Sequence, residues 1–231
     1  MKRHNSIDMW RGITIIAMII YHTIYDLENF YDYNINLNLY YFQQYICWSF
    51  IFISGISLNF SENYFKKAKI LIVVSTLITI ATYIFSKDNL ILFGIMHFFA
   101  SAFLIQSVCN KFVKKINPTK GLIFSMILFL FFKRIYFKEL LFGLIKLDNA
   151  IYNHNLFIIG LPSSNFYSAD YFPIIPWIFL FYAGYFSYNF LKLKKKEASQ
   201  NILNIMGRHS LFLYLIHQVV IIIVLKIIFG Y

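Results

Sequence analysis

The chain contains seven long runs of apolar residues separated by short polar segments, and this pattern limits what it can fold into. Each run matches the roughly 20 residues that a helix needs to cross a bilayer. Because no water reaches the bilayer core, backbone groups there must be paired within the segment, as they are in a helix. The sequence therefore predicts an all-α polytopic membrane helix bundle, a single domain over residues 1–231 with about seven transmembrane helices, at 9–27, 40–60, 68–86, 90–109, 121–137, 171–190 and 209–229.

Composition and charge support a membrane protein over a nucleic-acid-binding one. Only 13% of the residues are charged, about half the share of a soluble domain. The net charge of +11 comes largely from Lys and Arg in short segments between apolar runs, and such residues collect in cytoplasmic loops. We therefore predict an N-in/C-out protein, surrounded by lipid in the inner (cytoplasmic) membrane and without a nucleic-acid partner. The abundance of Ile, Phe, Tyr, Asn and Lys is typical of a low-GC bacterial genome.

Two further features concern the linking segments and the cysteines. The segment between the fifth and sixth runs is long for a compact protein, and residues 138–147 within it are amphipathic enough to predict a short interfacial helix. The only cysteines, Cys47 and Cys109, lie inside apolar runs. They indicate neither a disulfide framework nor a metal site.

The first helix carries an unusual stripe of ionisable residues. Side chains three or four positions apart share one helix face, and here that face holds Asp8, Arg11, Ile15, Met18, His22 and Asp26. At about 1.5 Å per residue, Asp8 and Asp26 are about 27 Å apart, close to the full hydrocarbon thickness. Titratable groups at such depth almost always face the bundle interior or a watery cavity. The stripe should therefore point inward.

His22 and Asp26 are the first candidates for catalysis. A carboxylate beside an imidazole N–H fixes the tautomer and raises the basicity of the other ring nitrogen, which suits a general base. A histidine that merely hydrogen-bonds a neighbouring helix is the alternative for His22. For Asp8 and Arg11, the alternative to a binding role is an ion pair at the helix end that orients the span.

Three other helices offer candidate partners. His97 follows Gly94 at helical spacing in the fourth run, at a depth like that of His22. Asp170 precedes two prolines at the start of the sixth run, where it either caps that helix or projects into a cavity to bind substrate. His217, in the last run, shares a face with Tyr214 and could line the same cavity.

The last helix begins with two basic residues, Arg208 and His209. Helix N-termini and basic side chains together favour anions such as phosphate. Ordinary anchoring by positive residues on the cytoplasmic side is the alternative explanation.

Five ordered motifs resemble one known family. They are Ser6-Ile-Asp8-Met-Trp-Arg11-Gly12 leading to His22, Phe52 to Ser57 with Phe60-Ser61, Phe93-Gly94-Ile-Met-His97, Ser168-Ala-Asp170-Tyr-Phe-Pro173 to Trp177, and Gly207-Arg208-His209-Ser210 to His217-Gln218. The chain is similar over most of its length to the bacterial branch related to the catalytic domain of heparan-alpha-glucosaminide N-acetyltransferase, within the transmembrane acyltransferase superfamily.

This resemblance implies a membrane acyltransferase that takes an acetyl group from cytoplasmic acetyl-CoA and delivers it to an extracytoplasmic sugar amine or hydroxyl. Asp8, Arg11, Arg208 and His209 would then bind the CoA thioester, His22 would act as general base with Asp26 orienting it, and His97 would stabilise the oxyanion or position the acceptor. Asp170 and His217 would contact the acceptor, an envelope glycan or a small molecule.

Two other classes of function stay open on the sequence alone. The same histidines and aspartates could serve a carrier for a small polar or anionic solute, although broken helices and a two-fold repeat, which favour a carrier, are not evident. A membrane scaffold without catalysis is the third class, and so many titratable groups within the spans count against it. The oligomeric state is also open, a homodimer included.

Overall fold

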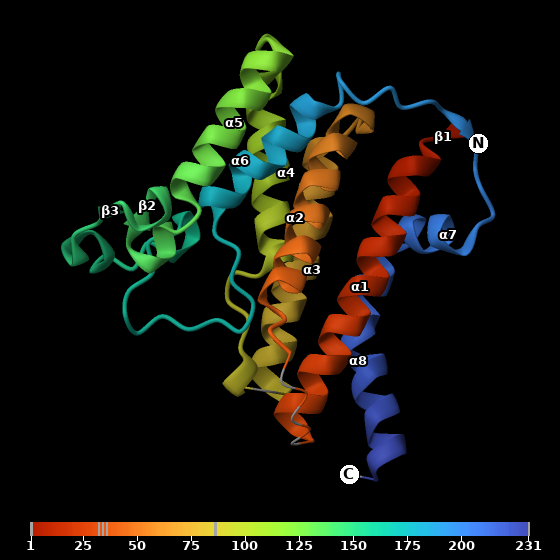
Figure 1. Cartoon of the computed structure of the whole chain (residues 1–231), viewed down its shortest axis with the longest axis vertical. Coiled ribbons are helices and arrows are strands. Elements are labelled where there is room, and N and C mark those ends of the chain that lie inside the picture. Colours follow the sequence, from red (N-terminus) through yellow and green to blue (C-terminus); the bar gives the residue numbers. More distant parts are fainter. Residues whose placement is uncertain (1, 32, 34, 36, 86, 231) are drawn as a thin grey trace. The chain divides into compact units, whose positions relative to one another are not determined.

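The computed structural model describes residues 2–31, 33, 35, 37–85 and 87–230, and these residues are mostly helical (Figure 1). They form eight α-helices: α1 (Asn5–Phe30), α2 (Tyr40–Ser57), α3 (Tyr64–Phe85), α4 (Ile95–Val113), α5 (Pro118–Phe132), α6 (Ile174–Ser187), α7 (Ile202–Arg208) and α8 (Ser210–Phe229). Short 3-10 helices occupy Leu58–Phe60, Lys87–Asn89, Ile135–Phe137, Leu141–Gly143, Asn149–Tyr152 and Phe157–Ile159. The described residues also contain two antiparallel strand pairs: β1 (Lys2–Arg3) with β4 (Lys196–Glu197), and β2 (Glu139–Leu140) with β3 (Ile145–Lys146).

Each of the seven predicted runs falls on an α-helix, which confirms the helical class. Among the described residues, three helices are long and apolar enough to cross a membrane, α1, α3 and α8, and α6 is a shorter apolar helix. The protein is therefore a membrane protein. The number of crossings and the direction of each stay predictions.

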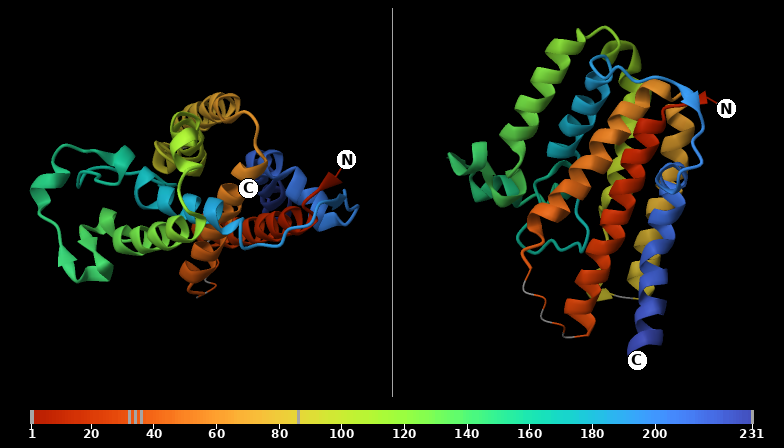
Figure 2. Two further views of the ribbon diagram at one scale, coloured as in Figure 1. Left: turned by 90° about the horizontal axis from the view of Figure 1, so that it is seen from above. Right: turned by 45° about the vertical axis from the view of Figure 1, so that its right-hand side comes forward.

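One compact unit comprises residues 1–53 and 191–231. In it α1 packs against α7 and α8, and the right-hand view of Figure 2 shows α1 and α8 side by side. Its buried core joins Ile15, Ala17 and Met18 of α1 to Ile46 of α2. The β1–β4 pair holds the chain before α1 against the segment before α7, with Arg3 opposite Lys196.

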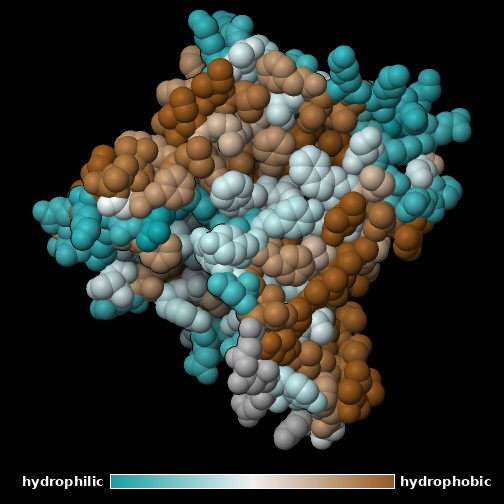
Figure 3. Space-filling model, in the orientation of Figure 1, coloured by the Kyte–Doolittle hydropathy of each residue, from teal (hydrophilic) through white to brown (hydrophobic). Residues whose placement is uncertain are grey.

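The outward side of α8 is apolar along its length. Val219, Ile223 and Ile227 are exposed there, and apolar side chains cover this helix in the space-filling view (Figure 3). Such a surface suits contact with lipid.

The second compact unit comprises residues 54–190. Here α3 packs on α4, α5 packs on α6, and α4 contacts α6. Phenylalanine rings fill the α4–α6 contact: Phe181 lies edge-on to Phe98, with 6.1 Å between ring centroids, and to Phe103 at 5.9 Å. On the α5 side, Trp177 packs against Phe129 at 5.8 Å.

The segment after α5 differs from its prediction. Residues 138–147 form the β2–β3 hairpin and a 3-10 turn, so the predicted interfacial helix is wrong. Lys138, Leu141, Phe142 and Gly143 all have positive φ angles, from 46° to 101°. A right-handed helix cannot include residues in the left-handed region, which explains the difference.

Candidate functional site

The polar stripe of α1 is inward-facing at both ends, as predicted. Asp8 is 3% exposed and Asp26 is 1% exposed, while Arg11 and His22 are partly exposed. α7 and α8 pack on α1, and α8 supplies the partner of Asp26, whereas Asp8 is paired with Arg3 and Arg11 near the start of the chain. The polar residues form two separate clusters, one at each end of α1.

At the C-terminal end of α1, four side chains from two helices meet. The amide nitrogen of Gln218 donates to Asp26 Oδ2 at 2.8 Å, and the His22 and His217 rings lie 4.8 Å apart between centroids. We call His22, Asp26, His217 and Gln218 the α1–α8 cluster. Three of its members are predicted site residues, and the structure brings them together.

The α1–α8 cluster contains buried polar atoms that lack a hydrogen-bond partner among the described residues. They are Asp26 Oδ1, Gln218 Oε1 and His217 Nε2. Buried polar groups in native proteins are nearly always paired, and leaving one unpaired costs about 1–3 kcal/mol. Three in one place indicate a site where a ligand or water supplies the missing hydrogen bonds.

The prediction that Asp26 orients His22 is wrong, because no hydrogen bond joins these two side chains in the described part of the chain. Asp26 bonds Gln218, while the His22 ring packs edge-on against Tyr21 at 5.3 Å and lies beside His217. Sequence reasoning missed Gln218 as the carboxylate's partner. Its signal was a polar amide next to His217 inside an apolar run.

At the N-terminal end of α1, Asp8 binds two arginines. Its Oδ2 accepts from Arg3 Nε at 3.0 Å, and its Oδ1 lies 3.3 Å from Arg11 Nη1. We call Arg3, Asp8 and Arg11 the Asp8 cluster. Burial, reinforced by the positive charge of Lys195, lowers the pKa of the neighbouring His4, and the charge of Asp8 opposes that effect.

The two predicted basic residues of the last helix lie at the junction of α7 and α8. Arg208 ends α7 and donates from Nη1 to the Ser199 carbonyl at 2.7 Å, while His209 is exposed between the two helices. A Cβ at Gly207 would overlap the Asp8 carbonyl, so α7 crosses directly over the start of α1. The crossing brings the chain at Arg208 to the Asp8 cluster.

His97 and Asp170, in the unit of residues 54–190, both act at the start of α4. Asp170 Oδ2 accepts from the backbone N–H of Ile95 at 2.9 Å, and a parallel bridge between Phe93 and Tyr171 holds the two segments together. Asp170 therefore caps α4, whereas the capping alternative in the sequence concerned the proline-containing α6. The N-cap of α6 is Pro173, with no side-chain cap. Burial raises the pKa of Asp170 to about 6.

Both ring nitrogens of His97 are occupied. Nδ1 accepts from the Gly94 N–H at 3.2 Å, so the proton of the neutral ring is on Nε2, which lies 3.1 Å from Thr79 Oγ1. The Thr79 hydroxyl in turn donates to the Ile91 carbonyl at 2.7 Å. This chain of hydrogen bonds joins α3 to the start of α4.

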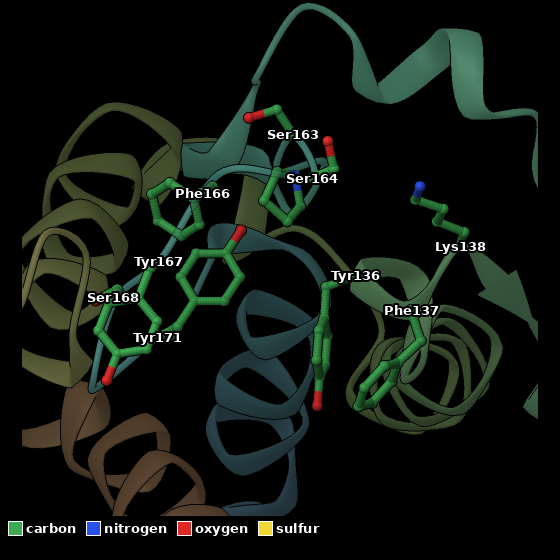
Figure 4. A pocket seen from close by; sticks show the side chains of 10 residues that line it. Tyr136, Phe137, Lys138, Ser163, Ser164, Phe166, Tyr167, Ser168 and Tyr171 are labelled. Carbon is green, nitrogen blue, oxygen red and sulfur yellow. The ribbon is translucent and has the colours of Figure 1, made fainter.

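The segment between α5 and α6 has an open hollow of about 330 Å³ on its surface (Figure 4). Aromatic rings and hydroxyls line it, among them Tyr136, Phe137, Ser164, Phe166 and Tyr171. It takes in Lys138 at one edge and includes no predicted site residue.

Comparison with known proteins identifies a protein family that the sequence matches. The sequence model of the family described as "Heparan-alpha-glucosaminide N-acetyltransferase, catalytic" matches residues 3–219. Searches of curated proteins and of solved structures gave no match. The matched region contains the Asp8 cluster, the start of α4 and the α1–α8 cluster. The chain therefore belongs to the heparan-alpha-glucosaminide N-acetyltransferase catalytic-domain family, a family of acetyltransferase domains.

Proposed function

We propose that the protein moves an acetyl group from acetyl-CoA on the cytoplasmic side of a bacterial membrane to a sugar amine or hydroxyl on the other side. Membership of an acetyltransferase family supports the reaction class. The observation that carries the proposal is that α1 has an arginine-rich cluster at one end and a buried, incompletely hydrogen-bonded cluster with two histidines at the other.

The proposed topology has seven crossings with the N-terminus inside. It rests on the seven helices that coincide with apolar runs and on the basic residues around β1, β4 and α7. In this topology the Asp8 cluster is cytoplasmic and the α1–α8 cluster is nearer the outer surface. Arg11 and His22 are about 17 Å apart along α1, a span that the extended pantetheine arm of CoA would have to cover.

The cytoplasmic end suits the phosphates of CoA. Guanidinium groups bind phosphate through paired hydrogen bonds. Asp8 holds Arg3 and Arg11 in place and so acts as a positioning residue, while Arg208 and His209 extend the basic surface.

The α1–α8 cluster suits the transfer step. An amine or hydroxyl must lose a proton as it attacks the thioester carbonyl, and a buried imidazole is a suitable acceptor for that proton. The contacts of His97 and Asp170, by contrast, support a structural role at the start of α4. We therefore place the acceptor at the α1–α8 cluster.

The test uses purified protein in nanodiscs with acetyl-CoA labelled in the acetyl group, and glucosamine or an envelope glycan extract as acceptor. We expect label transfer that is lost in Asp26→Ala and retained in Thr23→Val, a nearly isosteric change of a hydroxyl that bonds its own helix at the Ile19 carbonyl. Saturable solute uptake into proteoliposomes without CoA release, and without label transfer, would overturn the proposal in favour of a carrier.

A further inference from the structure

The tautomer of His217 is set by the backbone of its own helix. Its Nδ1 lies 2.5 Å from the Tyr214 carbonyl oxygen. A carbonyl oxygen only accepts hydrogen bonds, so Nδ1 must carry a proton. In the neutral ring, Nε2 then holds the free lone pair.

The lone pair on Nε2 is not engaged in a hydrogen bond with the described residues. His217 is 9% exposed, and its Nε2 is buried without a hydrogen-bond partner in the described part of the chain. Asp26 Oδ1 and Gln218 Oε1 are in the same condition. All three atoms are acceptors, so a group that completes the site must bring hydrogen atoms to donate.

His22 lacks the corresponding arrangement. Its ring is partly exposed and makes ring contacts with Tyr21 and His217, and no hydrogen bond with the described residues fixes its tautomer. A base needs its lone pair in a fixed direction, and of the two imidazoles His217 meets this requirement.

We infer that His217 is the general base of the acetyl transfer; the inference rests on the proposed function. The acceptor N–H or O–H donates to Nε2 of His217. As the acceptor's lone pair forms a bond to the acetyl carbonyl carbon, its proton passes to Nε2 and the C–S bond of the thioester breaks. The leaving CoA thiolate then takes that proton, so the products are the acetylated acceptor and CoA thiol. Asp26, held by Gln218, supplies negative charge to the cluster while the ring is cationic.

Two variants of His217 test its proton-accepting nitrogen, Nε2, separately from the hydrogen bond that Nδ1 donates to the Tyr214 carbonyl. The amide nitrogen of His217→Asn can replace Nδ1 and keep the bond to the Tyr214 carbonyl, but this variant has no atom in place of Nε2. His217→Gln places an amide near the position of Nε2, but an amide does not titrate. His22→Gln is the matched change on α1, and Val220→Ala is the control on the exposed side of α8.

The experiment measures kcat and KM for acetyl-CoA between pH 5 and 9, with glucosamine as acceptor in nanodiscs. We expect both His217 variants to lower kcat about 10²- to 10⁴-fold with little change in KM, and to lose the fall in rate at low pH that protonation of a base produces. His22→Gln should keep that low-pH limb, and Val220→Ala should match the wild type. Monodispersity and the melting temperature check that each variant is folded.

The possible results distinguish a failure of the proposed acetyl transfer from a failure of the role assigned to His217. If the wild type transfers no label to glucosamine or to the envelope glycan extract, the proposed function and this inference both fail. If the wild type is active but either folded His217 variant stays within about threefold of its kcat, or keeps the low-pH limb, the inference alone is overturned. Loss of the limb in His22→Gln would overturn it in favour of His22.

Discussion

Gly12 of α1 lies directly against the Leu203 carbonyl of α7, so closely that a Cβ at residue 12 would overlap the carbonyl oxygen and carbon. Gly207, further along α7, meets the Asp8 backbone in the same way. Only a residue without a side chain allows the two backbones to approach this far. The crossing of α1 and α7 therefore depends on two glycines that flank the Asp8 cluster.

Gly12→Ala is expected to disrupt this crossing. The new methyl group would meet the backbone of Leu203, which cannot move aside as a flexible side chain can. We therefore expect the free energy of unfolding to fall by about 1–3 kcal/mol. Thermal unfolding in detergent measures it. Ile13→Ala, at a position 40% exposed on the same helix, is the control and should have a much smaller effect. Equal melting temperatures for Gly12→Ala and the wild type would contradict the close crossing.

Asp170 predicts a pH dependence of stability. Its pKa is raised from the ordinary value near 4 to about 6 in the folded protein, because burial disfavours the charged form. The folded state therefore binds this proton more tightly than the unfolded state, and the resulting stabilisation is complete below about pH 4 and lost as the pH rises through about 6. In Asp170→Asn the amide oxygen can still accept the Ile95 N–H but does not titrate. We expect the melting temperature of the wild type to fall relative to that of Asp170→Asn as the pH rises from 4.5 to 7.5.

Asp170→Ala tests the hydrogen bond that caps α4 separately from the titration of the carboxyl group. It removes the acceptor of the Ile95 N–H, so it should destabilise the protein by about 1 kcal/mol even at low pH. Parallel pH courses for wild type and Asp170→Asn would show that the carboxyl does not titrate in this range.

His97 and Thr79 should be energetically coupled. Each hydrogen bond of this kind contributes about 1 kcal/mol, and His97→Ala or Thr79→Val alone breaks the bond between them. A double-mutant cycle on unfolding free energies should therefore give a coupling of at least about 0.5 kcal/mol. The control cycle pairs His97→Ala with Ser101→Ala, because the Ser101 hydroxyl bonds the backbone carbonyl of residue 97, which the first change retains. Additive effects in the first cycle would show that the bond between His97 and Thr79 contributes nothing to stability.

Arg11→Gln is expected to act on donor binding. If Arg11 meets a CoA phosphate, removing its charge should raise the KM for acetyl-CoA at least about tenfold with little change in kcat, since a charged hydrogen bond is lost. Lys226→Gln removes an exposed charge near the C-terminal end of α8 and should leave KM unchanged. An equal KM for Arg11→Gln and the wild type would remove Arg11 from the donor site.

The sequence was sufficient to predict seven of the eight α-helices of the described residues and the stripe of α1, but not the short helix α7. Hydrophobic runs and the 3.6-residue period are local properties, so the burial of Asp8 and Asp26 followed from their spacing and from the cost of exposing titratable groups to lipid. The partner of Asp26 could not be predicted in the same way. Gln218 is 192 positions away along the chain, and only the packing of α8 on α1 brings it to the carboxylate.

The remaining differences also arise from contacts that are distant in sequence or from backbone geometry. Asp170 stands just before α6, yet the bridge between Phe93 and Tyr171 turns its carboxylate toward α4. After α5, the amphipathic pattern favoured a helix, but Leu141 and Phe142 adopt left-handed conformations that apolar residues seldom show. A pattern of polarity contains no information on either feature.

The packing of α1 on α7 and α8 also fixes an order of events during synthesis. α1 leaves the ribosome well before α7 and α8, the two helices that pack on it. Until residues 202–229 emerge, Asp26 lies in a nascent helix without Gln218, its hydrogen-bond partner, at an energetic cost within lipid. A chain cut short before α7 would keep Asp26 without that partner, so α1 would carry an unpaired carboxyl group at the depth of the membrane.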